Sequence, residues 1–166
     1  MQLTRFTDIG LRVLMRLAAD EGETVHTARG LAAELAVPYA HVAKVVSRLA
    51  EMGVVHARRG RAGGLTITPL GRTAGVGWVT RRLEGDAEVV DCENPAPCPL
   101  RPVCRLRGAL AAAQNAFYES LDALTVADLV VGDSAHILPL ISRADPARAG
   151  TADVGSRSTP AENRNR

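Results

Sequence analysis

Cysteines are the residues of this chain whose type and spacing most directly suggest chemistry. All three, Cys92, Cys98 and Cys104, lie in the stretch CENPAPCPLRPVC, with five residues between neighbours. Thiolates are soft ligands for zinc and for iron-sulfur clusters, whereas an odd number of cysteines does not make a disulfide framework. The four prolines of this stretch restrict its backbone and help to hold the sulfur atoms in place before a metal binds.

An iron-sulfur centre explains this spacing better than zinc, and three ordinary buried thiols are the structural alternative. Zinc sites usually have four protein ligands and at least one pair of cysteines separated by two to four residues. Both gaps here are five residues long. Iron-sulfur clusters also usually take four cysteines, so a cluster on these three leaves one iron in need of another ligand.

The N-terminal half of the chain has the apolar periodicity of three short helices. Residues 7–19 and 28–35 repeat apolar side chains at helical spacing, and Thr7 and Thr27 stand where N-terminal caps belong. A third helix is expected between Pro38, which suits a first helical turn, and Gly53, which suits a helix end.

The third helix combines an apolar face with a basic one. Val42, Val45, Val46 and Leu49 share one face. His41, Lys44 and Arg48 lie together well away from it. Two helices joined by a tight turn, the second with a basic outer face, predict a helix-turn-helix whose second helix enters the major groove of DNA. The plainer alternative is an ordinary solvated helical surface.

Two short strand-like runs, VVHAR and LTIT, follow this helix and are separated by RGRAGG. They predict a hairpin, or wing, whose basic tip reaches phosphates or a narrow minor groove. The candidate DNA-binding residues of helix and wing are Tyr39, His41, Lys44, Ser47, Arg48, Arg58, Arg59 and Arg61.

The C-terminal half predicts a weaker helix over 73–83, the cysteine loop, and then a long helix. Apolar residues recur in nearly heptad steps in this last helix, at Leu106, Leu110, Ala113, Phe117, Leu121 and Leu124. A narrow apolar stripe needs a partner, and a second copy of the chain is the simplest one, with packing on its own domain as the alternative. The spacing of Thr125 and Asp128 resembles a capping box and predicts a short terminal helix.

Composition favours a mainly α protein without a membrane segment. Apolar residues make up 46% of the chain but aromatic residues only 3%, which favours helices over a large sheet. Charges inside the first apolar segment argue against a signal peptide, no long uncharged apolar run is present, and we expect a cytoplasmic protein. The tail lacks large apolar residues and is expected to be disordered. The predicted divisions are a winged helix-turn-helix DNA-binding domain over 1–85, a cluster loop over 86–104, a dimerisation helix with a short terminal helix over 105–132, and a disordered tail over 143–166.

Together these residues resemble a known family over about residues 1–132. The segments LTRFTDIGLRVLMRLA, RRGRAGGLTI and TRRLEGD, with the C-x5-C-x5-C spacing, are similar to the Rrf-type winged-helix regulators. This family includes iron-sulfur regulators and nitric-oxide-sensing repressors. Some members place a histidine three residues after the last cysteine, where this chain has Arg107, which offers only hydrogen-bond donors and cannot ligate iron. The wing also departs from the family, with Leu65 where tyrosine is frequent.

The resemblance is strongest to the nitric-oxide-sensing members and implies a ligand set. It implies that Cys92, Cys98 and Cys104 hold a 4Fe-4S cluster, with 2Fe-2S as the alternative, and that Asp8 of the other subunit completes it. An acidic residue in the first turn of a helix is favoured by the helix dipole in any case. Glu84, Asp86, Asp91 and Glu93 are competing ligands that lie nearer in sequence.

The function implied is that of a homodimeric repressor that binds an inverted-repeat DNA operator and is released when nitric oxide reacts with its cluster. A regulator of the same family that senses redox stress or cluster supply is the first alternative, and a cluster carrier or assembly protein is the second. We expect no enzyme, because the sequence contains no nucleophile-base pair, phosphate loop or paired-carboxylate arrangement.

Overall fold

The computed structural model describes residues 2–20, 24–58, 60, 63–85 and 88–132. Its N-terminal helices are α1 (Arg5–Ala18), α2 (Ala28–Glu34) and α3 (Tyr39–Glu51), followed by the strands β1 (Val55–Arg58) and β2 (Gly64–Ile67). Next come α4 (Pro69–Thr73), α5 (Val76–Glu84), the 3-10 helix η1 (Arg101–Val103), the long α6 (Arg105–Asp122) and the 3-10 helix η2 (Ala127–Val130).

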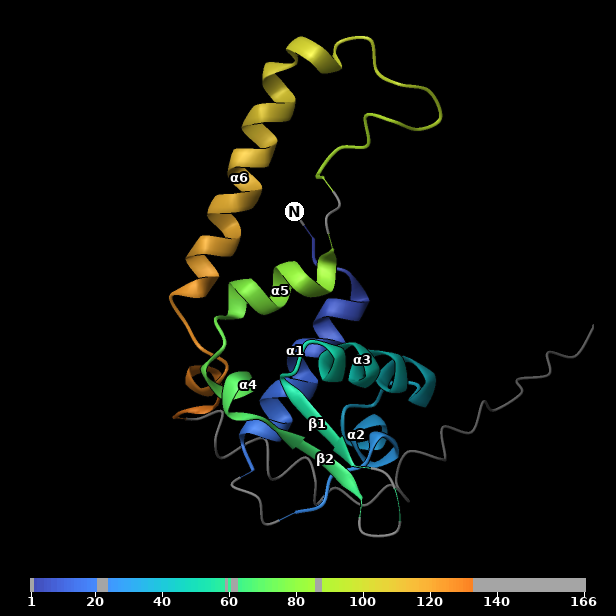
Figure 1. Ribbon diagram of the computed structural model, residues 1–166, viewed down its shortest axis with the longest axis vertical. Coiled ribbons are helices and arrows are strands. Elements are labelled where there is room, and N and C mark those ends of the chain that lie inside the picture. The colour runs from blue at the N-terminus through green and yellow to red at the C-terminus, as the bar shows by residue number, and fades with distance from the viewer. Residues whose placement is uncertain (1, 21–23, 59, 61–62, 86–87, 133–166) are drawn as a thin grey trace, which may run out of the picture.

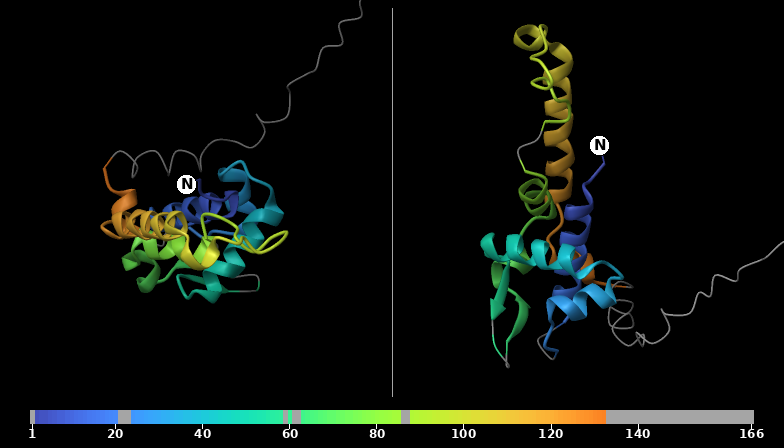
Figure 2. Two further views of the ribbon diagram at one scale, coloured as in Figure 1. Left: turned by 90° about the horizontal axis from the view of Figure 1, so that it is seen from above. Right: turned by 90° about the vertical axis from the view of Figure 1, so that its right-hand side faces the viewer.

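The molecule has a base of short elements from which one long helix extends (Figures 1 and 2). The base contains α1 to α5 and the hairpin. Helix α6 rises away from it and carries the cysteine loop at its far end. Helix, helix, helix, hairpin and helix in this order form the predicted mainly α winged helix-turn-helix fold.

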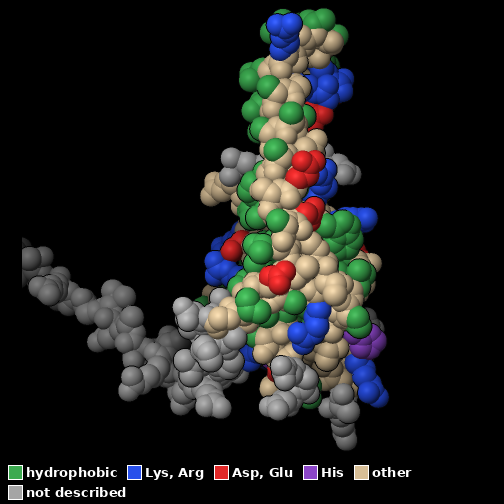
Figure 3. All heavy atoms as spheres, turned by 90° about the vertical axis from the view of Figure 1, so that its left-hand side faces the viewer, with side chains coloured by type: hydrophobic (Ala, Val, Ile, Leu, Met, Phe, Trp, Pro, Cys, Tyr) green, Lys and Arg blue, Asp and Glu red, His purple; other side chains and the backbone are tan. Residues whose placement is uncertain are grey.

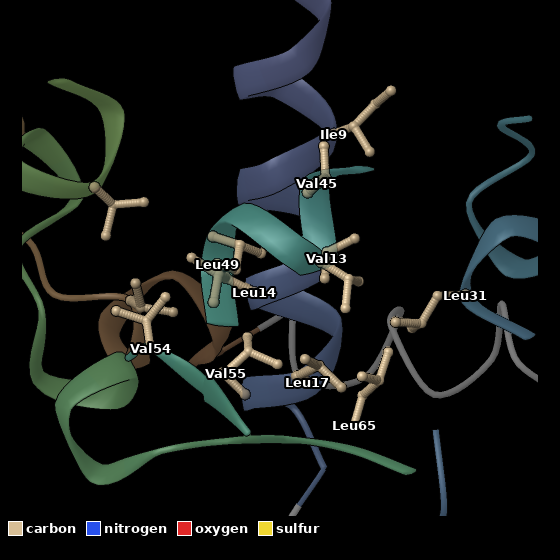
Figure 4. Close-up of a cluster of buried hydrophobic side chains, with 14 of the residues drawn as sticks. Ile9, Val13, Leu14, Leu17, Leu31, Val45, Leu49, Val54, Val55 and Leu65 are labelled. Carbon is tan, nitrogen blue, oxygen red and sulfur yellow. The ribbon is translucent and has the colours of Figure 1, made fainter. Parts of the chain in front are cut away.

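The core of the base lies where α1 crosses α3 (Figure 4). Ile9, Val13 and Leu14 of α1 pack with Val45 and Leu49 of α3, and all five are buried. This contact follows from the apolar periodicity of both helices. The start of α1 was predicted too late, because the cap is Thr4, whose hydroxyl accepts the N–H of Thr7 at 3.3 Å, while Thr7 itself is buried.

The second and third helices begin and end close to where the sequence predicts. The hydroxyl of Thr27 accepts the N–H of Gly30 at 3.0 Å and caps α2 as expected. Pro38 occupies the cap position of α3 and gives no side-chain hydrogen bond there. Just beyond α3, Gly53 has a φ of +74°, the left-handed conformation that ends many helices and that glycine adopts without strain.

The predicted hairpin is present, and its strands pair from Val55 with Ile67 to Arg58 with Gly64. A third short segment joins it, because the N–H of Leu65 donates to the carbonyl oxygen of His26 at 2.8 Å. The wing is thereby attached along one edge to the turn between α1 and α2.

The helix predicted over 73–83 is in fact two elements, α4 and α5, with a sharp bend between them. Gly75 caps α5, and Gly77 lies in its first turn against α6. A Cβ atom at Gly77 would overlap the carbonyl oxygen of Tyr118, so only glycine allows the two helices to approach this closely. The carboxylate of Asp122, at the end of α6, accepts the N–H of Trp78 at 2.6 Å and caps α5 from another helix.

Helix α6 confirms the long helix of the sequence prediction. Tyr118 is its one buried side chain, while Leu106 is 65% exposed. Hydrophobic side chains gather along one side of α6 (Figure 3). The predicted capping box after α6 is present, since the carboxylate of Asp128 accepts the N–H of Thr125 at 2.8 Å, although it starts a 3-10 helix and not an α-helix.

Among the described helices, none is both long enough and apolar enough to cross a membrane. The tail predicted to be disordered, residues 143–166, lies outside the described residues.

Candidate metal centre and nucleic-acid interface

The three cysteines lie in an extended loop and at the start of α6. The N–H of Cys98 donates to the carbonyl oxygen of Cys92 at 2.9 Å, which closes the first half of the loop. Cys104 is the cap residue of α6, and its Sγ accepts the N–H of Arg107 at 3.4 Å. All three thiols are free and half-buried.

The chemistry of these donors fits an iron-sulfur cluster, and their described arrangement leaves it incomplete. Within the described part of the chain, no three His, Cys, Asp or Glu side chains are gathered closely enough to hold a metal ion. Three soft thiolates on one short loop suit cluster iron. Three cysteines are one ligand short of the four that such clusters usually take.

Arg107, at the position where some family members have a ligand histidine, forms an ion pair instead. Its Nε donates to Glu88 at 2.6 Å, and a second guanidinium nitrogen contacts the other oxygen of the same carboxylate. The guanidinium holds the pKa of Glu88 below its usual value, and the carboxylate raises the pKa of Arg107. This two-point contact ties the entrance of the loop to the first turn of α6.

An open hollow of about 280 Å³ lies beside this pair and is lined by Cys92, Arg101 and Arg107 among others. Glu93, also in its lining, pairs with Arg101 at 2.5 Å. Side chains of both charges thus surround the first cysteine of the loop.

The competing carboxylates near the loop have other partners. Asp91 accepts the N–H groups of Glu93 and Asn94 at 2.9 and 3.0 Å, and these bonds lower its pKa. Glu84 accepts the N–H of Thr4 at 2.8 Å at the beginning of α1. Asp86 lies outside the described residues.

Asp8 lies on the outer side of α1, in its first turn, and its side chain is 45% exposed. It pairs with Arg12 one turn later at 2.9 Å. Helix α1 belongs to the base, whereas the cysteine loop lies at the far end of α6 (Figure 1). Within one chain, Asp8 and the cysteines are therefore not brought together.

The predicted DNA-binding residues with described side chains are all exposed on α3 and the wing. Tyr39 begins α3 and is 49% exposed, and Arg58 stands at the end of β1. His41 and Ser47 are also exposed. Arg59 and Arg61, predicted at the tip of the wing, lie outside the described residues.

Lys44 and Arg48 have contacts on the side of α3 that faces the N-terminal end of α1. Lys44 Nζ lies 5.8 Å from the centre of the Phe6 ring. Arg48 donates to Glu51 at 3.3 Å and to the carbonyl oxygen of Arg82 at 3.4 Å. The basic face of α3 thus contacts α1 and the end of α5 as well as solvent.

Arg29 is a candidate that the sequence prediction missed. This exposed residue of α2 places its guanidinium 5.0 Å from the centre of the Tyr39 ring, at the start of α3. The contact joins a cation to a predicted base-contacting residue. A single arginine in a short helix gives no sequence signal for this, because the contact depends on how α2 and α3 cross.

Comparison with known proteins identifies the family. Residues 3–132 match the Rrf2 family, described as "Iron-dependent Transcriptional regulator". The chain belongs to this family. Membership makes it a DNA-binding transcription regulator and not an enzyme, and confirms the resemblance seen in the sequence motifs.

Relatives in the Rrf2 family carry the name NsrR. The chain is 57% identical to the HTH-type transcriptional repressor NsrR of Streptomyces coelicolor over 139 residues, which are 83% of this chain and 94% of that protein. It is 38% identical to the HTH-type transcriptional regulator NsrR of Geobacillus kaustophilus over 132 residues, which are 78% and 90% of the two chains. The coarser prediction, a DNA-binding repressor, agrees with these names.

Solved structures of Rrf2-type proteins share the fold. The oxidized form of Staphylococcus aureus CymR superposes with a TM-score of 0.60 at 22% identity, over 80% of this chain and 98% of that one. The T. potens IscR structure gives a TM-score of 0.60 at 20% identity, over 78% and 86%.

Proposed function

We propose that this chain is a cytoplasmic, homodimeric repressor that holds an iron-sulfur cluster and leaves its DNA operator when nitric oxide reacts with that cluster. The observation that carries the proposal is the 57% identity to a repressor named NsrR, in a chain that has three cysteines in one loop. Its operator would be an inverted repeat, because a two-fold symmetric dimer presents two recognition helices to two half-sites.

Cys92, Cys98 and Cys104 would hold the cluster, in the 4Fe-4S form that the resemblance implies, and Asp8 of the second subunit would supply the fourth ligand. The pairing of Arg107 with Glu88 supports this choice, since the position three residues after the last cysteine, where some family members have a histidine, is occupied by a paired cation. Two carboxylates close to Cys92 also have other partners. Glu93 pairs with Arg101, and Asp91 accepts backbone N–H groups. A bound cluster would offer nitric oxide an iron whose carboxylate ligand is weaker than its thiolate ligands.

The surroundings of Asp8 explain how its release would reach the DNA-binding surface. The beginning of α1 is attached to the end of α5 by the contact of Thr4 with Glu84, and Phe6 touches Lys44 of the recognition helix. A pull on Asp8 therefore acts on a helix that packs directly against α3. Its loss would let the two recognition helices of the dimer shift relative to each other, and half-site spacing depends on that distance.

Titration of the anaerobically isolated protein with nitric oxide tests the function. We expect the visible absorption of the cluster to bleach, and binding to an operator duplex in a gel-shift assay to fall over the same range of nitric oxide. If nitric oxide left DNA binding unchanged, whereas peroxide or iron limitation removed the cluster and altered DNA binding, the result would favour the redox or cluster-supply regulator. Unchanged DNA binding after complete bleaching would contradict the proposal.

Replacement of Asp8 by alanine tests the fourth ligand. We expect the variant to lose the intact cluster during anaerobic native mass spectrometry, or to react with nitric oxide at an altered rate, because one iron lacks its protein ligand. Glu93→Ala is the matched control, since it removes a carboxylate adjacent to Cys92 and should leave the cluster intact. A normal cluster with unchanged nitric oxide reactivity in Asp8→Ala would rule out the ligand role.

Substitutions in the wing and in the recognition helix should affect DNA binding differently. Alanine at Arg58, Arg59 or Arg61 should lower the affinity for every sequence and reduce the salt dependence by about one phosphate contact each. Alanine at Tyr39, His41 or Lys44 should change sequence preference, and Ser47, Arg48 and Arg29 are proposed to support the same surface. Titrations of specific and scrambled duplexes at several salt concentrations separate the two classes, and a wing variant that changed only specificity would contradict this division.

A further inference from the structure

A buried histidine and aspartate form a pair at the base of the wing, outside the cluster loop and the DNA-contacting surface. His26 Nε2 lies 2.8 Å from Asp20 Oδ2, and the two side chains are only 4% and 9% exposed. Both residues belong to the segment between α1 and α2. The two polar side chains satisfy each other in a region where an unpaired one would be destabilising.

The pair is connected to the wing through the backbone. The carbonyl oxygen of His26 accepts the N–H of Leu65 in β2 at 2.8 Å. The neighbouring Val25 lies so close to Gly64 that a Cβ atom there would be 2.7 Å from Val25 Cγ1. The segment that carries His26 therefore fits closely along the edge of β2. The contact lies at the start of β2, where Gly64 pairs with Arg58 of β1.

The pair is also connected to the helix that follows the wing. Arg72 of α4 donates to the carbonyl oxygen of Asp20 at 2.8 Å and to that of Ala18, near the end of α1, at 2.9 Å. Asp20, His26 and Arg72 thus join the end of α1, the edge of β2 and the helix after the hairpin. These elements enclose the base of the wing on the side of α1.

Open space lies beside the pair. An open hollow of about 180 Å³ is lined by Asp20, Thr24, His26, Thr66 and Arg72, among others. Leu65 and Thr66 of β2 border this hollow, so β2 faces open space on part of the side toward the pair. The backbone bond to His26 and the buried side chain of Leu65 together hold β2 against the body of the domain.

We propose that Asp20 and His26 are positioning residues for DNA binding, which hold the wing in the position from which Arg58 reaches the DNA backbone. The inference rests on the proposed contact of Arg58 with DNA. The pair would keep the wing in one position, and without the pair Arg58 would contact phosphates only part of the time.

A double-mutant cycle between His26→Gln and Arg58→Ala tests this coupling. In the otherwise natural protein, Arg58→Ala should weaken binding of an operator duplex about tenfold at low salt. In the His26→Gln background, the same change should weaken binding only about twofold, because the displaced wing has already lost most of that contact. An Arg58→Ala effect that stays tenfold in the His26→Gln background would overturn the inference while leaving the wing contact in place.

A buried ion pair between α1 and α2 provides the matched control for lost stability. Arg16 and Glu34 pair at 2.7 Å between α1 and α2, away from the wing, with side chains 5% and 18% exposed. Glu34→Gln should lower the melting temperature yet leave the effect of Arg58→Ala at about tenfold. Loss of the Arg58 effect in Glu34→Gln as well would show general destabilisation and would overturn the positioning role.

Asp20→Asn gives a second route to the same answer if His26→Gln does not fold. It keeps the size of the side chain and removes its charge, and far-ultraviolet circular dichroism at the assay temperature confirms that the tested protein is folded. We expect the Arg58→Ala effect to fall in Asp20→Asn too, and an unchanged effect in this folded variant would overturn the inference. An Arg58→Ala change without effect in the otherwise natural protein would instead refute the wing contact itself.

Discussion

Replacement of Cys98 by serine is expected to abolish cluster assembly while the winged-helix base remains folded. Serine provides a hard, normally protonated oxygen in place of a soft thiolate, so two cysteines remain for a cluster that already lacks a fourth thiolate. The loop lies at the far end of α6, and none of its described side chains belongs to the buried core, so the melting temperature of the cluster-free protein should change by only about 2 °C or less. Iron and sulfide content with the visible spectrum, and thermal unfolding of the cluster-free protein, measure the two effects.

Arg101→Ala is the control for this change, because it breaks the pair with Glu93 in the same loop and keeps all three thiols. It should retain iron and sulfide close to the level of the natural chain. A Cys98→Ser protein that still assembled the normal cluster would contradict the ligand set. It would show that Cys98 itself is an ordinary thiol and that the cluster takes its ligands from other residues.

Replacement of Gly77 by alanine should destabilise the protein by about 3 kcal/mol. Helix propensity alone predicts the opposite sign, since alanine is favoured over glycine within a helix by about 1 kcal/mol. At Gly77 the packing effect is larger, because the added Cβ would overlap the backbone carbonyl of Tyr118 and approach the Asp122 carboxylate, and backbone cannot turn aside as a flexible side chain can. Urea denaturation of the cluster-free protein measures the free energy of unfolding.

Gly108→Ala is the matched control, because Gly108 lies within α6, the helix that packs against α5. A Cβ at Gly108 meets no described atom within 4 Å. The control should therefore follow propensity and stabilise the protein by about 0.5 to 1 kcal/mol. Equal changes in the free energy of unfolding for the two substitutions would contradict the close approach of α5 and α6 at Gly77.

Local signals in the sequence predicted much of the fold. The cap at Thr27, the capping box of Thr125 with Asp128, and the apolar face of α3 each depend on residues at most one or two helical turns apart. Competing local signals produced the errors. Thr4 and Thr7 both suit a cap, and the structure chooses Thr4. Helix α4 has only five residues, too few for a periodicity, although Thr68 before Pro69 was a usable start signal.

Contacts between distant residues could not be predicted in this way. Glycines at 75 and 77 weakened the prediction of α5, whereas they are what lets α6 and Asp122 approach it from 44 residues away. The pairing of Arg107 with Glu88 across the loop likewise has no local pattern. The spacing of the cysteines favours an iron-sulfur cluster, whereas the proposal of Asp8 as a ligand from the second subunit rests on family resemblance.

The junction of α5 and α6 has a consequence for how such regulators diversify. The two helices are joined at the base by Asp122 capping Trp78, and by the N–H of Val76 donating to the carbonyl oxygen of Leu124 at 2.9 Å. The segment between the two helices, residues 85–104, joins their opposite ends. The length of this connection can therefore vary without breaking the contacts at the base. Its metal ligands are less free to vary, since the proposed fourth ligand, Asp8, comes from the base of the second subunit.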